Sequence, residues 1–113
     1  MNEIVDMAML RFTEEAKKVY GDKLNKVILY GSAARDDYDD DSDVDIMLLL
    51  NVEQDSLEME REKLLSITDL LDDEFDYELL FSPLVQSIDL FNDWADVLPF
   101  YKNVKKEGVV YGT

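Results

Sequence analysis

The sequence predicts an α+β fold in which helices pack on a small mixed sheet. Two continuous apolar runs, residues 27–30 and 46–50, are typical of buried strands. Two longer stretches, residues 4–20 and 53–71, instead repeat their apolar residues with a helical period. The predicted order is helix, strand, strand, helix, strand, helix, and the 113 residues suit one domain spanning residues 1–113.

The first helix and the first strand are separated by a glycine. Residues 4–20 place an apolar side chain every three or four positions: Val5, Met9, Phe12, Ala16 and Val19. Gly21 follows, as glycine commonly does just beyond the C-terminus of a helix. Residues 26–30 then form a first strand, which the pair Gly31-Ser32 ends.

The second strand and the second long helix follow an acidic loop. Residues 44–50 form the strand, and its unbroken apolar run predicts a central place in the sheet. Residues 53–71 form the helix, whose apolar stripe consists of Leu57, Leu64, Ile67 and Leu71. Three acids follow at residues 72–74. Because negative charge opposes the macrodipole at a helix C-terminus, we expect the helix to end before them.

The third strand lies within residues 75–86, where the side chains alternate between two sides. One side carries Asp76, Glu78, Leu80 and Ser82. Pro83 predicts a strand end or an edge strand, because proline has no N–H to donate. Beyond it we expect a helical turn at 87–92, a helix at 96–106 and a short strand or packed tail at 109–111.

Composition limits the chemistry that is available. The chain has neither cysteine nor histidine, which excludes disulfides, thiol nucleophiles and Ser-His-Asp triads. Any metal must therefore have oxygen ligands, which indicates Mg²⁺, Mn²⁺ or Ca²⁺. The formal net charge is -16. Such a surface repels nucleic-acid backbones and anionic membranes, so neither is an expected partner.

The sequence also predicts where the protein resides. No apolar run is long enough to span a membrane, and the N-terminus lacks the pattern of a signal peptide. We therefore expect a cytoplasmic protein.

Two carboxylates mark the start of the second strand. Asp43 and Asp45 end the acidic loop, and residues i and i+2 of a strand point to the same face. Two anionic side chains held together repel each other unless a cation lies between them. Asp43 and Asp45 are therefore candidate ligands of a divalent metal.

Two further features suggest that this metal serves phosphate chemistry. Gly31 allows the backbone to come close to a ligand, and the Ser32 hydroxyl and neighbouring amides can donate hydrogen bonds to phosphate oxygens. Arg35 either contacts a phosphate or pairs with a nearby Asp. A third carboxylate, Glu78 or Asp76, would lie on a neighbouring strand, and three such carboxylates can hold two metal ions.

The run LYGSAARDDYDDDSDVDIMLLL, residues 29–50, resembles the signature of the polymerase-beta-type nucleotidyltransferase superfamily. The resemblance depends on a Gly-Ser pair, a ten-residue spacer and an Asp-x-Asp pair preceded by serine. It is similar in particular to the minimal members, which are stand-alone domains of about this size. The tail PFYKNVKKEGVVYG, residues 99–112, resembles the ending of many such proteins.

The resemblance implies a set of roles. Gly31 and Ser32, with Arg35, would bind the nucleoside triphosphate, ATP in the first instance. Asp43, Asp45 and a third acid would bind Mg²⁺, or Mn²⁺ in its place, and this third acid would help to deprotonate the acceptor hydroxyl. Many minimal members act as antitoxins of a helical HEPN-type partner, some of them by transferring AMP to a tyrosine of that partner.

Two positions depart from the pattern of the family. Asp36 stands where the family usually has glycine, which adds a negative charge near the phosphates. The third acid is Glu78 or Asp76, whereas the family more often has Asp; we favour Glu78, which lies further into the predicted strand.

Three functions follow. The first is a metal-dependent nucleotidyltransferase that moves AMP from ATP to a hydroxyl, such as a tyrosine of a HEPN-type partner. The second is a catalytically weak or inactive domain that neutralises such a partner by binding. The third is an enzyme with a small-molecule acceptor, for which this short chain has no additional domain.

Overall fold

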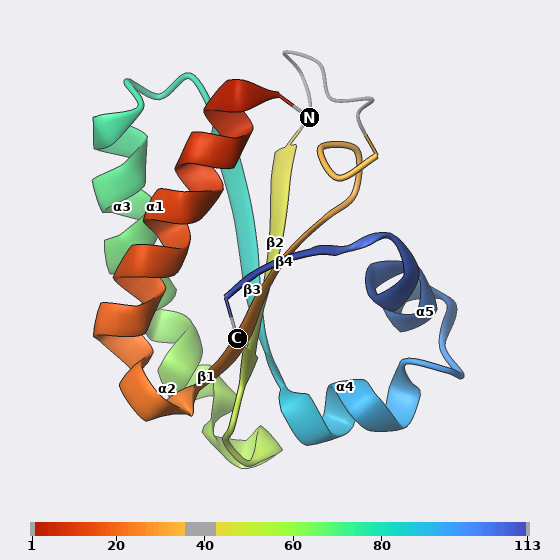
Figure 1. Cartoon of the computed structure of the whole chain (residues 1–113). Helices are drawn as coiled ribbons and strands as arrows, with labels where there is room; N and C mark the ends of the chain where they lie inside the picture. Colours follow the sequence, from red (N-terminus) through yellow and green to blue (C-terminus); the bar gives the residue numbers. More distant parts are fainter. Residues whose placement is uncertain (1, 36–42, 113) are drawn as a thin grey trace.

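Four strands form one mixed sheet in the computed structural model, which describes residues 2–35 and 43–112 (Figure 1). The order across the sheet is β3-β2-β1-β4. Strand β1 (Leu24–Tyr30) is antiparallel to both β2 (Asp43–Leu50) and β4 (Val109–Gly112), whereas β2 is parallel to β3 (Leu80–Ser87). The predicted α+β fold is confirmed, as are the central place of β2 and the edge position of Pro83 on β3.

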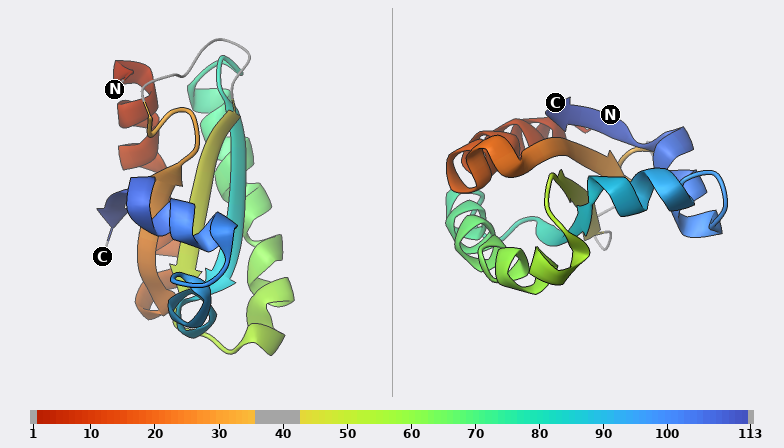
Figure 2. Two further views of the ribbon diagram at one scale, coloured as in Figure 1. Left: turned by 90° about the vertical axis from the view of Figure 1, so that its right-hand side faces the viewer. Right: turned by 90° about the horizontal axis from the view of Figure 1, so that it is seen from below.

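Helices cover both faces of this sheet (Figures 1 and 2). Helices α1 (Glu3–Tyr20), α2 (Leu57–Glu62) and α3 (Leu64–Glu74) lie on one face. Helices α4 (Ile88–Trp94) and α5 (Pro99–Glu107) lie on the other. Two short 3-10 helices, η1 (Gly21–Lys23) and η2 (Gln54–Ser56), follow α1 and precede α2.

The two-sided cover explains the unbroken apolar run of β2. Its even-numbered residues, such as Ile46 and Leu48, belong to the larger core under α1, α2 and α3. Its odd-numbered residues Met47 and Leu49 belong to a second, smaller core with Phe91 of α4 and Val104 of α5. A strand buried on both faces needs apolar residues at every position, so its sequence does not alternate. The odd-numbered face, which continues toward the start of β2, is the one that matters for function.

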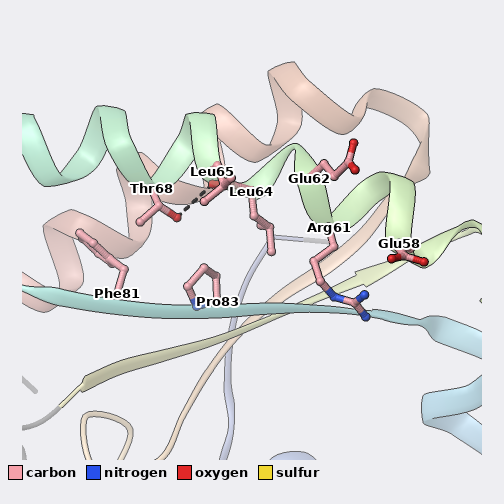
Figure 3. A pocket seen from close by; sticks show the side chains of 8 residues that line it. All are labelled: Glu58, Arg61, Glu62, Leu64, Leu65, Thr68, Phe81 and Pro83. Carbon is pink, nitrogen blue, oxygen red and sulfur yellow. Dashed lines mark hydrogen bonds between the residues drawn. The ribbon is translucent and has the colours of Figure 1, made fainter.

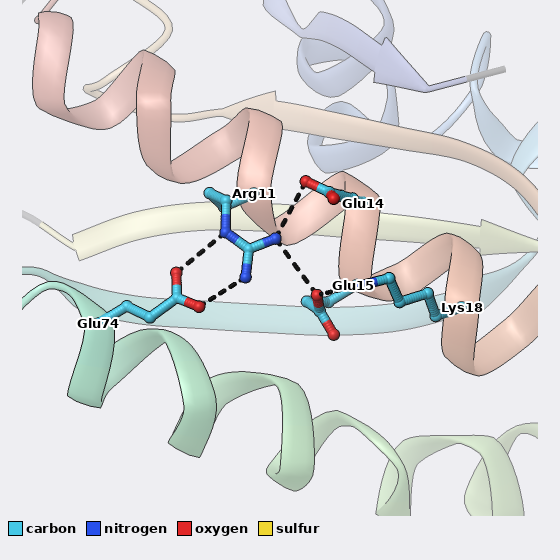
Figure 4. A network of polar contacts seen from close by, with 5 residues as sticks. All are labelled: Arg11, Glu14, Glu15, Lys18 and Glu74. Atoms are coloured by element: carbon cyan, nitrogen blue, oxygen red, sulfur yellow. Dashed lines mark hydrogen bonds and ion pairs between the residues drawn. The ribbon is translucent and has the colours of Figure 1, made fainter.

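Helix α1 has an N-terminal cap and makes a charged contact with α3. The side-chain oxygen of Asn2 accepts hydrogen bonds from the backbone N–H groups of Ile4 (2.9 Å) and Val5 (3.4 Å). Further along, the guanidinium of Arg11 binds Glu14 and Glu15 on its own helix and Glu74 at the end of α3 (Figure 4). This network lies at the surface and orients the two helices relative to each other.

The predicted end of the second long helix is wrong. The second long helix does not end at Leu71 before the three acids; α3 continues through them to Glu74. Arg11 Nε donates to Glu74 Oε2 at 3.0 Å, and this pairing offsets the unfavourable position of an acid at the C-terminus of a helix. The stretch 53–71 is also not one helix, because α2 and α3 are separated at Lys63.

The start of the third strand is also corrected. Residues 75–79 precede β3, which begins only at Leu80, so Asp76 and Glu78 do not lie on a strand. Asp76 (φ 53°) and Tyr77 (φ 58°) instead have left-handed backbone conformations. The Tyr77 N–H donates to Asp72 O at 2.8 Å and the Asp76 N–H donates to Asp73 O at 3.2 Å, which is the hydrogen-bond pattern that closes a helix C-terminus.

This helix end carries backbone strain that can be measured. A left-handed conformation costs a side chain other than glycine about 1–2 kcal/mol, and Tyr77 is 73% exposed, so its ring returns little packing energy. We expect Tyr77→Gly to be more stable than Tyr77→Ala by about 1 kcal/mol in urea unfolding, because both variants lose the ring and only glycine relieves the strain. Equal unfolding free energies for the two variants would contradict this account.

The buried carboxylate of Glu60 has an effect on folding stability that can be measured. Glu60 of α2 is 1% exposed, and its carboxylate is held by Lys63 Nζ at 2.7 Å and Lys23 Nζ at 3.2 Å. Burial by itself would raise the pKa of Glu60, but the hydrogen bonds from the two lysines outweigh it and hold that pKa below its usual range. The ion pairs therefore stabilise the fold only while Glu60 is ionised.

We expect Lys63→Met to lower the free energy of unfolding by about 1–2 kcal/mol at pH 7, a value reduced because water screens the 37% exposed Lys63. The pKa of Glu60 is lower in the folded protein than in the unfolded chain. The stabilisation by the ion pairs is therefore fully present above the unfolded pKa, about 4.3, and is lost as the pH falls through the folded pKa. Urea unfolding at pH 7 and pH 3.5 tests this, with Lys106→Met at an exposed lysine as control. The same deficit at both pH values would count against it.

The C-terminal elements match their predictions closely. Helix α4 follows Ser87, although the Ser87 side chain makes no capping hydrogen bond, and α5 has Pro99 in its first turn. Residues 109–112 form strand β4, and Tyr111 donates a hydrogen bond to Asp6 of α1 at 2.7 Å. None of the helices in the described parts of the chain combines the length and the apolar character that a membrane crossing requires.

Candidate nucleotide and metal site

The site begins where β1 ends. Gly31 follows Tyr30 with a φ of 77°, and a turn over residues 31–35 is closed by hydrogen bonds from the Ala34 and Arg35 N–H groups to Gly31 O, at 3.1 and 3.2 Å. A Cβ added at Gly31 would lie 2.3 Å from Oδ2 of Asp45. Glycine is therefore required twice at this position, for the left-handed backbone and for the space that the Asp45 carboxylate takes.

Asp43 and Asp45 lie side by side at the start of β2. Asp45 of β2 pairs with Tyr30 of β1. Both aspartates occupy odd-numbered positions of β2, so their side chains lie on the same face as those of Met47 and Leu49, which pack against α4 and α5. Their carboxylates therefore project from the same face of the sheet as α5. The prediction that strand geometry brings these two carboxylates together is confirmed.

The electrostatics of Asp45 are unfavourable in the protein by itself. Burial raises the pKa of the Asp45 carboxyl, the neighbouring charge of Asp43 raises it further, and Arg35 opposes both effects only in part. Burial, with the charge of Asp45 as a smaller cause, also raises the pKa of Tyr30 to about 12. A divalent cation at the two carboxylates would remove this cost, so the residues present fit a metal ion.

Arg35 leaves the turn toward α5. Its Nη1 lies 3.3 Å from Oε2 of Glu107, in the last turn of that helix. Tyr30, Gly31, Arg35 and Asp45 together line one side of a cavity of about 220 Å³, and residues of α5 line the other. The structure thus brings Gly31, Arg35 and Asp45 to one cavity. Ser32 lies in the same turn, and its role in nucleotide binding stays a prediction.

Glu78 does not lie on a strand of the sheet. It lies in the exposed turn before β3, where its N–H donates to Phe75 O at 3.0 Å. The β3 residues that pair with Asp43 and Asp45 are Leu80 and Ser82, neither of which is acidic. Among residues 2–35 and 43–112, no three acidic side chains converge closely enough to hold a metal ion. Neither Asp76 nor Glu78 lies on a strand, and which of them is the third acid stays a prediction.

Part of the predicted site lies outside the described residues. These are positions 36–42, which include Asp36, at the departure from the family pattern, and Ser42, which precedes the Asp-x-Asp pair. The structure describes the residues on either side of these positions, Arg35 and Asp43.

Sequence comparison agrees with the geometry of this site. A family model described as "Nucleotidyltransferase domain" matches residues 10–111, so the chain belongs to this family of enzymes. Two proteins of Methanocaldococcus jannaschii, each named "putative protein adenylyltransferase", are similar over nearly their whole length. One is 34% identical over 113 residues, 97% of this chain and 98% of its own. The other is 32% identical over 99 residues, 88% of this chain and 95% of its own.

The site also contains residues that the sequence did not single out for it. Phe100, Asn103 and Glu107 of α5 line the cavity together with Gly31 and Asp45. The only local signal is their spacing, since positions i, i+3 and i+7 share one face of a helix. Nothing in that spacing says that the face meets a loop nearly 70 positions earlier in the chain.

Proposed function

We propose that this protein is a Mg²⁺-dependent adenylyltransferase that moves AMP from ATP to a hydroxyl group of a protein, specifically a tyrosine of a HEPN-type partner, and thereby acts as its antitoxin. The observation that carries the proposal is the contact between Gly31 and the Asp45 carboxylate, with Asp43 beside it. This contact provides a backbone turn for phosphates immediately next to two metal ligands. The two relatives named as protein adenylyltransferases support a protein acceptor.

The reaction is a substitution at the α-phosphorus of ATP. The acceptor oxygen forms a new O–P bond, the bond between the α-phosphorus and the bridging oxygen breaks, and pyrophosphate leaves. The hydroxyl proton passes to a carboxylate of the site, a role that we propose for Glu78. When bound, Mg²⁺ would neutralise the developing charge on the phosphates, and Asp43 and Asp45 would hold it, because Mg²⁺ uses one or two carboxylates plus substrate phosphates.

Each part of the described site has a role in this scheme. The turn that begins at Gly31 would present the Ser32 hydroxyl to the phosphates. Arg35 contributes positive charge near Asp45, and Glu107 orients its guanidinium. The strand pairing between Tyr30 and Asp45 keeps the turn and the carboxylates in register.

A specific observation favours the second candidate, a domain that binds its partner without catalysis. The residue paired with Asp45 on β3 is Ser82, and Glu78 lies in the turn before that strand. If Glu78 supplies no carboxylate to the site, the domain retains the nucleotide turn and two metal ligands without a third acid. The two candidates differ in whether label moves to the partner.

The experiment incubates the chain with a HEPN-type protein, Mg²⁺ and ATP labelled at the α-phosphate. We expect label on the partner, no label with the Asp43→Asn variant, and no label when the acceptor tyrosine is replaced by phenylalanine. Neutralisation of the partner that persists in Asp43→Asn, with no label transferred by the unmutated chain, would establish the binding function instead. Glu78→Gln compared with Asp76→Asn tests the third acid, and we expect only Glu78→Gln to slow the transfer.

A further inference from the structure

One wall of the site cavity belongs to α5. The residues that α5 contributes are Phe100, Asn103, Val104 and Glu107, which share one face of the helix. Val104 is buried and anchors this face against Ile28 and Met47 in the smaller core. The wall is therefore a fixed part of the fold. A larger surface cavity of about 540 Å³, between α2, α3 and the edge strand β3, lies on the opposite face of the sheet and contains none of the site residues (Figure 3).

Phe100 is held in place by its neighbours but is not covered by them. Its ring meets Tyr30 edge-on, with centroids 5.6 Å apart and an interplanar angle of 85°, and meets Tyr101 at 5.2 Å and 78°. Two such contacts restrict the orientation of the ring. Phe100 nevertheless remains 45% exposed, although burying a phenylalanine is favourable. An oriented aromatic ring that lines a cavity and stays exposed is suited to stacking on a planar ligand.

Among the α5 residues that line the cavity, the charged group and the uncharged groups are separated along the helix. The ion pair between Glu107 and Arg35 lies in the last turn of the helix, on the side of the Gly31 turn. Phe100 lies in the first turn, about 10 Å along the helix from Glu107 at the helical rise of 1.5 Å per residue, and Asn103 lies between them, about 6 Å from Glu107. A nucleotide has the same division, since its phosphates are charged and its base is planar and uncharged.

We propose that α5 binds the nucleobase of the substrate, with Phe100 stacking on the ring and Asn103 hydrogen-bonding its edge. The amide of Asn103 offers one donor and one acceptor, the pair that matches the N6 amino group and N7 of adenine. The cavity of about 220 Å³ is smaller than the roughly 300–1,000 Å³ of pockets that enclose whole ligands. It therefore takes the base, while the phosphates extend over Gly31 toward Asp45. This inference rests on the proposed function and specifies its substrate as an adenine nucleotide.

Binding is measured without any acceptor protein, so that the test is independent of AMP transfer. We expect Phe100→Leu to weaken binding of Mg²⁺-ATP by about 10- to 100-fold in calorimetric titration, because the stacking partner is lost. Binding of Mg²⁺-tripolyphosphate, which has no base, should not change. Phe100→Tyr keeps the ring and should bind ATP as the unmutated chain does. Emission of the single tryptophan, Trp94, which packs against Tyr101 at 5.6 Å, confirms that each variant is folded.

Asn103 tests recognition of the base separately. We expect Asn103→Ala to reduce the preference for ATP over GTP by about tenfold or more, since one bidentate pair accounts for that much discrimination. Equal ATP affinity in the unmutated chain, Phe100→Leu and Asn103→Ala would overturn this inference and leave the proposed function intact. Failure of the unmutated chain to bind either ATP or tripolyphosphate would overturn the proposed function, and the inference with it.

Discussion

Asp45→Asn is expected to abolish AMP transfer without weakening the fold. Asparagine keeps the size of the side chain but removes the charge that would bind the metal, and losing several kcal/mol of transition-state stabilisation lowers the rate by about 100- to 1,000-fold or more. The measurement is single-turnover transfer of α-labelled AMP at saturating Mg²⁺. A rate within threefold of the unmutated chain would contradict the metal role of Asp45.

The stability of this variant provides an independent readout. The pKa of Asp45 is raised in the folded state, by burial first and by Asp43 second, so its ionised form opposes folding at neutral pH. Replacing it by asparagine removes that opposition, and we expect the unfolding midpoint in the absence of metal to stay constant or rise. Mg²⁺ should raise the midpoint of the unmutated chain and have little effect on Asp45→Asn. A variant that loses both activity and stability would indicate a structural role for Asp45.

Gly31→Ala is expected to have the second large effect, because it acts on the backbone and on Asp45 together. The left-handed conformation at φ 77° costs alanine about 1–2 kcal/mol. The added Cβ also meets the Asp45 carboxylate at 2.3 Å, so the carboxylate must move away from its place beside Asp43. We expect the rate of transfer to fall by at least 100-fold, because a displacement of a catalytic group by about 1 Å can slow a reaction by that factor.

Gly21 offers a matched control for this experiment. It has a φ of 55°, and a Cβ added there would meet nothing within 4 Å. Gly21→Ala should therefore lose about 1–3 kcal/mol of stability from backbone strain at a positive φ, with transfer unchanged. In Gly31→Ala/Asp45→Ala the contact is absent, so the stability cost of Gly31→Ala should shrink toward that of Gly21→Ala. If the two glycine variants lost activity equally, the contact with Asp45 would not be the cause.

The apolar runs identified β1 and β2, and Asp43 and Asp45 were placed correctly because the two-residue repeat of a strand is a local property. The strand that follows α3 was placed too early. Residues 75–79 have an alternating sequence, but the helix continues to Glu74 and closes through the left-handed residues Asp76 and Tyr77. Neither residue is glycine, so the usual signal of such a helix end is absent.

The sequence by itself determined the element types, the turn at Gly31 and the adjacency of the two carboxylates, because periodicity and spacing act over a few residues. Only the tertiary structure decided which face of the sheet the carboxylates use and what covers it. Helix α5 reaches Gly31 and Asp45 because β4, which follows it, pairs with β1, a contact between segments some 80 residues apart. Tertiary structure likewise made Leu80 and Ser82, neither of which is acidic, the partners of Asp43 and Asp45 on β3, since strand register depends on the packing of the whole sheet and not on the local pattern.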